Sequence, residues 1–145
     1  MATVNTYLTF NGNTEDAFNF YKSVFGGEFA YVGKFKDMPV DEKFPPPIGE
    51  EGNLIMHISL PISKETTLMG SDTTSFSGKV TIGTNFSISI NTDSKDEADK
   101  LFNGLSAGGK VTMPMEKTFW GAYFGMFTDK FGINWMVNFD ENPKG

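Results

Sequence analysis

The chain carries one structural pattern twice, and this internal repeat limits its possible folds more than any other feature. In each half a strand-like segment is followed by a turn or cap, an amphipathic helix and a pair of glycines. Leu8 in the first half corresponds to Ile88 in the second, and Gly26 corresponds to Gly108, so the offset rises only from 80 to 82 residues. A nearly constant offset favours a duplicated supersecondary unit over coincidence.

Both strand-like segments alternate apolar and polar residues, and both helices have recognisable ends. Residues 3–10 and 85–90 show the period of two that is typical of strands. Asn11–Thr14 is a turn that can supply a helix N-cap, and Ser94–Glu97 is a capping box. We expect each helix to end at its glycine pair, where a left-handed C-cap carries no steric cost.

Each half continues with further strand-like segments, which predicts two tandem βαβββ modules and an α+β fold. These segments are residues 29–35, 54–60 and 66–69 in the first half and 110–113, 123–128 and 134–139 in the second. We expect one domain, 1–145, made of a first module (1–72), a linker rich in Ser, Thr and Gly (73–83) and a second module (84–145). The proline-rich residues 36–53 are predicted to form a loop, either a functional flap or a surface insertion.

Composition excludes several classes of function. A formal net charge of −6 argues against a nucleic-acid-binding face, which is normally basic. Because the chain has no cysteine, disulfides, iron–sulfur clusters, thiolate metal sites and cysteine nucleophiles are excluded. The apolar runs are too short to span a membrane, and the first ten residues lack the pattern of a secretory signal. We therefore expect a cytoplasmic protein with no nucleic-acid partner and no membrane partner.

Short segments spread in order over nearly the whole chain form a further pattern. They are Tyr7–Asn13, Ala17–Tyr21, Phe25–Gly27, Leu54–His57, Leu68–Asp72, Trp120–Gly125 and Thr128–Trp135. Together they resemble the PhnB-like members of the vicinal oxygen chelate superfamily, which comprises glyoxalases, bleomycin-resistance proteins and dioxygenases.

The resemblance implies an architecture and a set of partners. The modules are expected to curl mixed sheets around a central cavity, with the helices outside, and such proteins are commonly homodimers. The superfamily includes metal-dependent isomerases, ring-cleaving dioxygenases, resistance enzymes and non-catalytic drug binders. Some PhnB-like members carry the label of a ubiquinone-pathway methyltransferase, but no glycine-rich loop after a strand suggests a methyl-donor nucleotide site in this sequence.

Strand alternation gives each strand an apolar face toward the helix and a more polar face toward the expected cavity. The predicted helix-side residues are Leu8, Phe10, Met56, Ile58, Leu60, Phe86, Ile88 and Ile90. The predicted cavity-side residues are Asn5, Tyr7, Thr9, Ile55, His57, Ser59, Asn85, Ser87 and Ser89. In the last strand Met136 falls on the polar face and Trp135 on the apolar face. A polar strand face fits a lined pocket or a sheet facing bulk water, and the resemblance favours the pocket.

The resemblance places the four metal-ligand positions of the superfamily on Asn5 (or Tyr7), His57, Asn85 and Met136. His57 and Met136 are 79 residues apart, close to the repeat offset. Only His57 is a good ligand for a hard divalent ion, because amide oxygens bind weakly and a thioether is a poor partner. We therefore expect no resident cofactor, and a divalent metal at His57 would need water or distant carboxylates to complete its site.

His57, the only histidine, is the candidate catalytic residue, as a hydrogen-bonding or proton-transferring group. Alternatively, it is the remnant of a ligand position, now half-buried with its hydrogen bonds satisfied. Trp120 and Tyr123 lie in the aromatic last hairpin, where they either stack on a flat ligand or a cation or belong to the core or a dimer contact. The predicted ligand-binding cavity comprises Asn5, Tyr7, His57, Ser59, Asn85, Ser87, Trp120, Tyr123 and Met136.

Three functions fit these observations. The first is the binding of a small molecule in the cavity, without a complete catalytic metal site. The second is a lyase, isomerase or transferase, in which a weakly held metal or His57 alone assists the reaction. The third is a structural or regulatory homodimer with a closed cavity. The sequence favours binding, because most of the expected metal ligands are missing.

Overall fold

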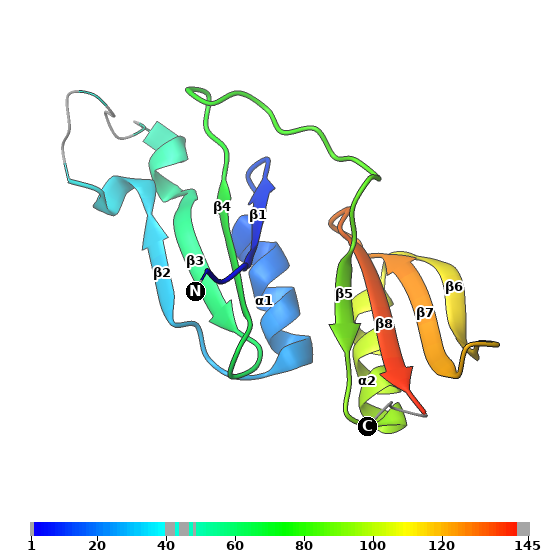
Figure 1. The fold of residues 1–145 in the computed structure, drawn as a ribbon. Helices are drawn as coiled ribbons and strands as arrows, with labels where there is room; N and C mark the ends of the chain where they lie inside the picture. Colours follow the sequence, from blue (N-terminus) through cyan, green and yellow to red (C-terminus); the bar gives the residue numbers. More distant parts are fainter. Residues whose placement is uncertain (1, 40–42, 44–46, 48, 142–145) are drawn as a thin grey trace. The chain divides into compact units, whose positions relative to one another are not determined.

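The two halves of the chain form two units, Met1–Thr81 and Ile82–Gly145, and each has its own sheet and its own helix. They are seen in a computed structural model that describes residues 2–39, 43, 47 and 49–141 (Figure 1).

The first unit packs one helix on a four-stranded mixed sheet. Its elements are β1 (Thr6–Phe10), α1 (Thr14–Phe25), β2 (Tyr31–Lys34), β3 (Ile55–Pro61) and β4 (Thr67–Asp72). The strands lie in the order β1-β4-β3-β2. β1 pairs with β4 in parallel, and the other pairs are antiparallel.

The second unit repeats this plan. Its elements are β5 (Ile88–Asn91), α2 (Lys95–Ser106), β6 (Lys110–Lys117), β7 (Ala122–Thr128) and β8 (Asn134–Asp140). The order is β5-β8-β7-β6, again with the first and last strands parallel and the other pairs antiparallel. Identical connectivity confirms the two tandem βαβββ modules and the α+β fold predicted from the sequence.

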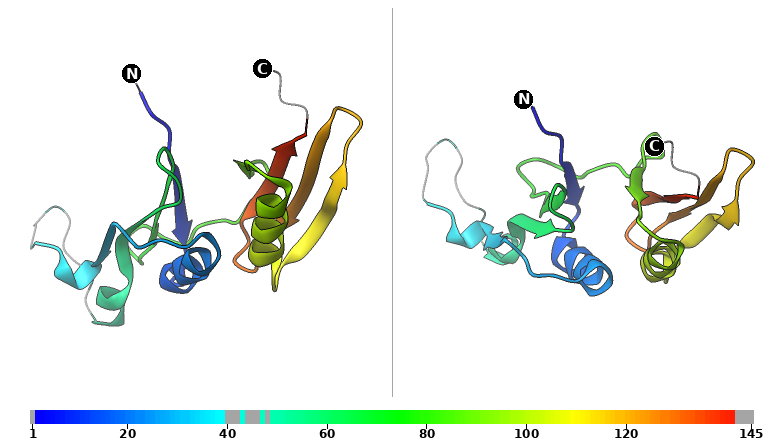
Figure 2. Two further views of the ribbon diagram at one scale, coloured as in Figure 1. Left: turned by 90° about the horizontal axis from the view of Figure 1, so that it is seen from below. Right: turned by 60° about the horizontal axis from the view of Figure 1, so that its bottom comes forward.

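Each helix covers one face of its own sheet, as the two views of Figure 2 show. In the first unit Ala17, Phe18 and Tyr21 of α1 are fully buried. Gly70 in β4 makes room for the Phe18 ring, because a Cβ atom at this position would lie 2.7 Å from it. Gly125 in β7 has the same role for Phe102 of α2, also at 2.7 Å. Close helix–sheet packing in both units therefore depends on a strand glycine.

The two helices begin in different ways. At α2 the Glu97 backbone N–H donates to the Ser94 hydroxyl at 3.0 Å, and this confirms Ser94 as the N-cap. The Glu97 carboxylate accepts from the Asp93 N–H at 3.0 Å rather than from Ser94. At α1 the Asn13 side chain makes no capping hydrogen bond. The carboxylate of Asp72, at the end of β4, accepts from the Thr14 N–H at 3.0 Å and caps this helix instead.

Two strands begin later than predicted. β1 starts at Thr6, so Asn5 precedes it, and β5 starts at Ile88, so Asn85 and Ser87 precede it. Phe86, which was assigned to the helix side, is 57% exposed. The reason lies in the partner strand, because the pairing of β5 with β8 begins at Ile88 opposite Trp135. The preceding segment is held instead by the Asn134 side chain, which donates to the carbonyls of Gly83 and Phe86 at 3.3 and 3.4 Å.

A bulge in β3 breaks the predicted alternation at one end. Gly33 of β2 pairs with His57, but Lys34 pairs with Ile55, so Met56 is an extra residue in β3. Ile55, which was assigned to the cavity side, is therefore buried, and Met56, assigned to the helix side, is only half-buried. Beyond the bulge the alternation holds, with Ile58 and Leu60 buried on the helix side.

The predicted loop 36–53 has a short 3₁₀ turn at each end, Phe35–Asp37 and Gly49–Asn53. Pro45 and Pro46 lie outside the described residues. In the predicted linker, Thr73 N–H donates to the Phe10 carbonyl at 2.8 Å, and the Val80 N–H donates to the Asn11 side chain at 2.9 Å. No helix within the described part of the chain is long and apolar enough to cross a membrane.

Candidate functional site

The face of the first sheet opposite α1 carries a row of side chains that crosses all four strands. The strand register places Tyr7 of β1 beside Met69 of β4, Met69 beside Ser59 of β3, and Ser59 beside Tyr31 of β2. Residues paired in this way project from the same face of a sheet. The adjacent row, which includes Leu8 and Ile58, lies on the opposite face and is buried under the helix. The row from Tyr7 to Tyr31 therefore lies on the open face.

His57 lies between the two tyrosines of this face. Its ring stacks on that of Tyr7, with centroids 5.7 Å apart and planes inclined by 25°. The Tyr7 hydroxyl lies 3.3 Å from His57 Nδ1. On the other side, the Tyr31 ring centroid is 5.8 Å from that of the imidazole. We call Tyr7, Tyr31 and His57 the aromatic cluster.

Gly33 shapes one side of the aromatic cluster. It pairs with His57 across β2 and β3, and the Tyr31 side chain lies over it. A Cβ atom at Gly33 would lie 2.5 Å from the Tyr31 hydroxyl. Any larger residue would displace Tyr31, so this glycine lets the ring approach the imidazole.

The aromatic cluster is accessible and contains no carboxylate, ammonium or guanidinium group. Tyr7 is 48% exposed and Tyr31 is 49% exposed, whereas His57 is half-buried and Ser59 is buried. Two phenol hydroxyls and one imidazole supply hydrogen-bond donors and acceptors beside flat apolar rings. Such a surface can hold a flat molecule and orient its polar atoms.

The open face of the second sheet differs in character. Its register places Ser89, Met136, Met126 and Met113 in one row across β5, β8, β7 and β6. In the next row on this face, the Asn138 side chain donates to that of Asn91 at 3.1 Å. Met136 thus lies on the predicted face, among methionines, and Ser87 and Asn85 lie before the strand.

Tyr123 does not face this open side, which corrects the prediction. Its hydroxyl donates to Asp99 of α2 at 2.6 Å, and the Lys95 ammonium lies 4.6 Å from its ring centroid. The hydrogen bond to Asp99 raises the pKa of Tyr123 to about 12. Tyr123 has this orientation because it shares the parity of Gly125 and Phe127, the residues of β7 that meet the helix.

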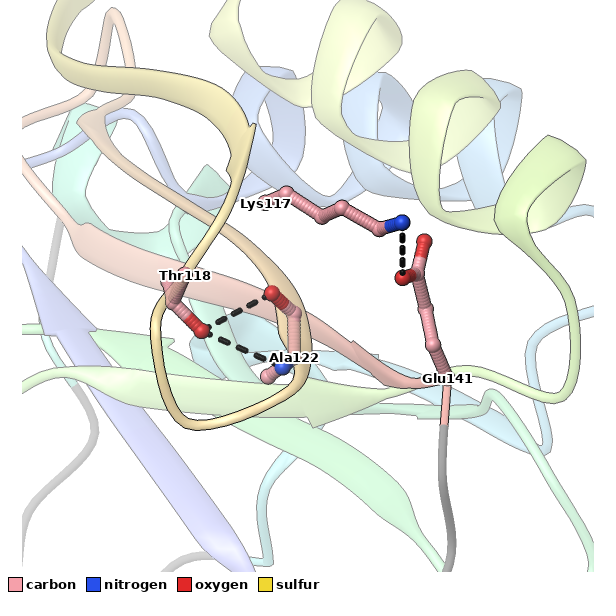
Figure 3. A network of polar contacts seen from close by, with 4 residues as sticks. All are labelled: Lys117, Thr118, Ala122 and Glu141. Carbon is pink, nitrogen blue, oxygen red and sulfur yellow. Dashed lines mark hydrogen bonds and ion pairs between the residues drawn. The ribbon is translucent and has the colours of Figure 1, made fainter.

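Trp120 lies at the tip of the hairpin between β6 and β7, 59% exposed, with its ring against that of Phe119 at 4.9 Å. The base of this turn is closed by Thr118, whose hydroxyl donates to the Ala122 carbonyl at 2.9 Å and accepts from its N–H at 3.1 Å (Figure 3). Beside it, Lys117 pairs with Glu141 at 3.3 Å. The turn that carries Trp120 is therefore well fixed.

The predicted metal-ligand positions do not fit a divalent ion. Within the described residues, no three His, Cys, Asp or Glu side chains are arranged so that they could hold a metal ion. Of Asn5, His57, Asn85 and Met136, only His57 is a good ligand, and its Nδ1 already faces the Tyr7 hydroxyl.

Sequence reasoning did not select Tyr31, Met69 or Gly33. The alternation of Tyr31 and Gly33 within the predicted strand 29–35 was the available signal, but the faces of that strand were not assigned. It also missed two buried carboxylates with structural roles, Asp72 and Asp129. Asp129 accepts hydrogen bonds from the Phe131 and Ile133 N–H groups at 2.8 and 3.0 Å and from the Trp135 indole at 2.8 Å. The motifs that contain these acids therefore stabilise turns.

Comparison with known proteins gives a consistent result. Residues 3–137 match the family model of the Glyoxalase/Bleomycin resistance protein/Dioxygenase superfamily. Protein YjdN of Escherichia coli (strain K12) is 33% identical over 144 residues, which covers 93% of each chain. The crystal structure of protein PA1353 from Pseudomonas aeruginosa is similar with a TM-score of 0.83 and 39% identity, covering 98% of this chain and 100% of that one.

A PhnB protein from Bacillus cereus, described as a putative 3-demethylubiquinone-9 3-methyltransferase, has a TM-score of 0.70 and 26% identity, with 95% of this chain and 99% of that chain covered. These matches confirm the resemblance to PhnB-like proteins that was inferred from the sequence. The duplicated βαβββ plan, the family match over nearly the whole length and these relatives lead to one conclusion: the chain belongs to the glyoxalase/bleomycin resistance protein/dioxygenase superfamily.

Proposed function

We propose that the protein binds a small, flat molecule on the open face of its first sheet, at the aromatic cluster. One observation carries the proposal. Tyr7, Tyr31 and His57 come from three different strands, yet the centres of both tyrosine rings lie within 5.8 Å of the imidazole centre, on the face that the helix leaves uncovered. Membership of a superfamily that includes bleomycin-resistance proteins supports a role in binding.

The physical properties of the cluster suit a ligand better than they suit a core. Tyrosine rings offer a large contact area at a small cost in conformational entropy, and their hydroxyls supply polar contacts. The rings are already held against one another, so little further ordering is needed when a ligand binds. Since Tyr7, Ser59, Met69 and Tyr31 are all uncharged, the surface fits a neutral ligand or one with a delocalised charge.

The proposal is tested by a screen of flat compounds observed through the imidazole signals of His57, the only histidine in the chain. A binder is expected to shift these signals in the wild type. The variant Tyr31→Ala is expected to weaken binding about tenfold, because a ring contact and its buried area are lost.

The control is Met126→Ala, on the open face of the second sheet, which leaves the aromatic cluster intact. Native mass spectrometry of the purified protein adds a search for ligand carried over from the cell. If no compound shifts the His57 signals and no ligand is carried over, the proposal is wrong. Equal weakening by Tyr31→Ala and Met126→Ala would place binding elsewhere.

We also propose that the protein is a homodimer. Support comes from apolar side chains at the surface of the described structure, including Phe119 at 97% exposure. Single exposed apolar residues are ordinary, but aromatic ones at the tip of a well-fixed turn are more often found at contacts. Sedimentation velocity gives the mass directly, and a monomer at micromolar concentration would contradict this proposal.

A further inference from the structure

We infer that Tyr7 is a positioning residue that keeps the proton of the neutral His57 ring on Nε2, so that the site selects flat ligands with a carbonyl or carboxylate oxygen. The part about ligands rests on the proposed function. The part about the proton on His57 does not.

The inference begins with the contact between the two side chains. The Tyr7 hydroxyl lies 3.3 Å from Nδ1 of His57, and the rings stack with an inclination of 25°. A neutral imidazole has one nitrogen that donates and one that accepts. A phenol is a better donor than acceptor, and an imidazole lone pair is a strong acceptor, so the favoured arrangement has Tyr7 donating to Nδ1. The proton of the ring must then be on Nε2.

No competing group in the described part of the chain favours the form with the proton on Nδ1. In many proteins a carboxylate or a backbone carbonyl accepts from Nδ1–H, which leaves Nε2 free as a base or a metal ligand. Among the described residues, Tyr7 is the hydrogen-bond partner that the structure gives to the His57 ring. With Tyr7 as the donor in this contact, the usual arrangement is reversed. Nε2 carries a proton, and it can neither accept a proton nor bind a metal in this form.

The position of this proton determines which ligand groups the site recognises. An Nε2–H group on a half-buried imidazole donates to an oxygen of the ligand, and the hydroxyl of Tyr31 lies on the same open face. The site is rich in rings and has no charged group in the row from Tyr7 to Tyr31. A flat compound with a carbonyl or carboxylate oxygen satisfies both features, because it stacks on the rings and accepts the hydrogen bond.

The first experiment measures where the proton is. A single histidine gives one pair of imidazole nitrogen signals, so ¹⁵N-labelled protein can be read without assignment. The spectrum is recorded at a pH high enough to keep the ring neutral. We expect a protonated Nε2 and an unprotonated Nδ1 in the wild type, and a shift toward a mixture of the two forms in Tyr7→Phe. The matched control is Tyr31→Phe, which removes the hydroxyl of the other tyrosine in ring contact and is expected to leave the nitrogen signals in place.

The second experiment tests selection, with benzoate and acetophenone as acceptors and ethylbenzene as a flat probe without a strong acceptor. The two acceptors are expected to shift the Nε2 signal of the wild type, and ethylbenzene is not. In Tyr7→Phe the affinity for acetophenone is expected to fall about twofold if the competent form drops to half of the population. His57→Gln keeps a donor amide and is expected to retain more affinity than His57→Leu, which is expected to lose about fivefold.

The outcomes separate the two proposals. A protonated Nδ1 in the wild type, or nitrogen signals that Tyr7→Phe leaves unchanged, overturns the inference whatever the protein binds. Equal shifts from ethylbenzene and acetophenone overturn the selection of an acceptor oxygen. If the proton is on Nε2 as expected but no flat compound binds at all, the proposed function fails and the role of Tyr7 stands.

Discussion

The two modules share one topology, yet they secure the start of their helices by contacts of very different range. In the second module, Ser94 caps α2 from only three residues away. In the first module, the cap of α1 is Asp72, which is 58 residues from Thr14 in the sequence. The start of the helix is thus capped by a local contact in the second module and by a long-range contact in the first.

The buried carboxylates extend this contrast. Asp72 accepts from the N–H groups of Gly12, Thr14 and Ile55 and from the Thr14 hydroxyl, so it joins the β1–α1 turn to the start of β3. The hydrogen bonds given above for Asp129 reach Phe131, Ile133 and Trp135, at most six residues away, in the turn between β7 and β8 and at the start of β8. Removal of Asp72 therefore disconnects distant segments, whereas removal of Asp129 loosens one turn. The two modules thus share one topology but are held together by different contacts.

The largest expected effect comes from Asp72→Ala. It leaves buried N–H groups without an acceptor and is expected to lower the free energy of unfolding by about 4 kcal/mol. Asp129→Ala is expected to cost about 3 kcal/mol. Urea denaturation is followed by the His57 signals for the first unit and by Trp120 and Trp135 fluorescence for the second. A cost for Asp72→Ala below that for Asp129→Ala would remove the contrast between the modules.

The glycine pairs give the next largest effect. Gly27 has φ +80°, and a Cβ atom there would meet only the Pro61 carbonyl at 3.7 Å, so its requirement is conformational. Gly109 has an ordinary φ, but a Cβ atom there would collide with the Thr128 carbonyl. We expect Gly109→Ala to cost about 3 kcal/mol and Gly27→Ala about 1 kcal/mol, measured by thermal and urea unfolding.

Asparagine separates the two causes, because it tolerates positive φ better than alanine does. Gly27→Asn is expected to cost less than Gly27→Ala, whereas Gly109→Asn is expected to cost at least as much as Gly109→Ala. If alanine and asparagine rank in the same order of cost at Gly27 and at Gly109, the two glycine pairs have the same role.

The helix caps give a smaller effect. Ser94→Ala is expected to destabilise the second unit by about 1 kcal/mol, because the Glu97 N–H loses its acceptor. Asn13→Ala, at the corresponding position of α1, is expected to have almost no effect, because the Asn13 side chain makes no capping bond. A loss of similar size for Asn13→Ala would mean that α1 is capped locally after all.

The smallest effect concerns Tyr123 at high pH. Its pKa is raised from 10 to about 12 by the bond to Asp99, so the neutral form is favoured in the folded state. This contribution is fully present below pH 10 and is lost as the pH rises toward 12. We expect it to be below about 1 kcal/mol, because the pair is only partly buried.

The measurement is the stability of the wild type and of Tyr123→Phe, each followed from pH 9 to about 12. The difference in the free energy of unfolding between the two proteins is expected to decrease over this range. A difference that stays constant would show that the hydrogen bond with Asp99 contributes nothing to stability.

The features that the sequence could predict are those set by local rules. The alternation of Leu8 and Phe10, the capping by Ser94 and the end of α1 directly before Gly26 all depend on neighbours within a few residues. The sequence also predicted that Tyr7 and His57 lie on the same face of the sheet, because both strands keep a period of two at these residues.

The remaining features depend on partners that are distant in the sequence. The bulge at Met56 depends on pairing with β2, and the late start of β5 depends on where β8 begins. Tyr123 was listed with the cavity residues, but the phase of β7 is fixed by its packing on α2, which turns this side chain toward the helix. Tyr31 joined the site only when the fold brought β2 beside β3.

The hydrogen bonds of the linker define where this polypeptide can be divided. Asn11 pairs with the backbone of Val80 through both its amide oxygen and its amide nitrogen, at 2.9 and 3.2 Å, much as a neighbouring strand would. The Ile82 side chain already lies against Gly132, and Gly83 accepts from Asn134. A gene split after the codon for Thr81 would thus give two polypeptides that each keep these contacts, whereas a split after Asp72 or Gly83 would leave part of one module on the wrong fragment.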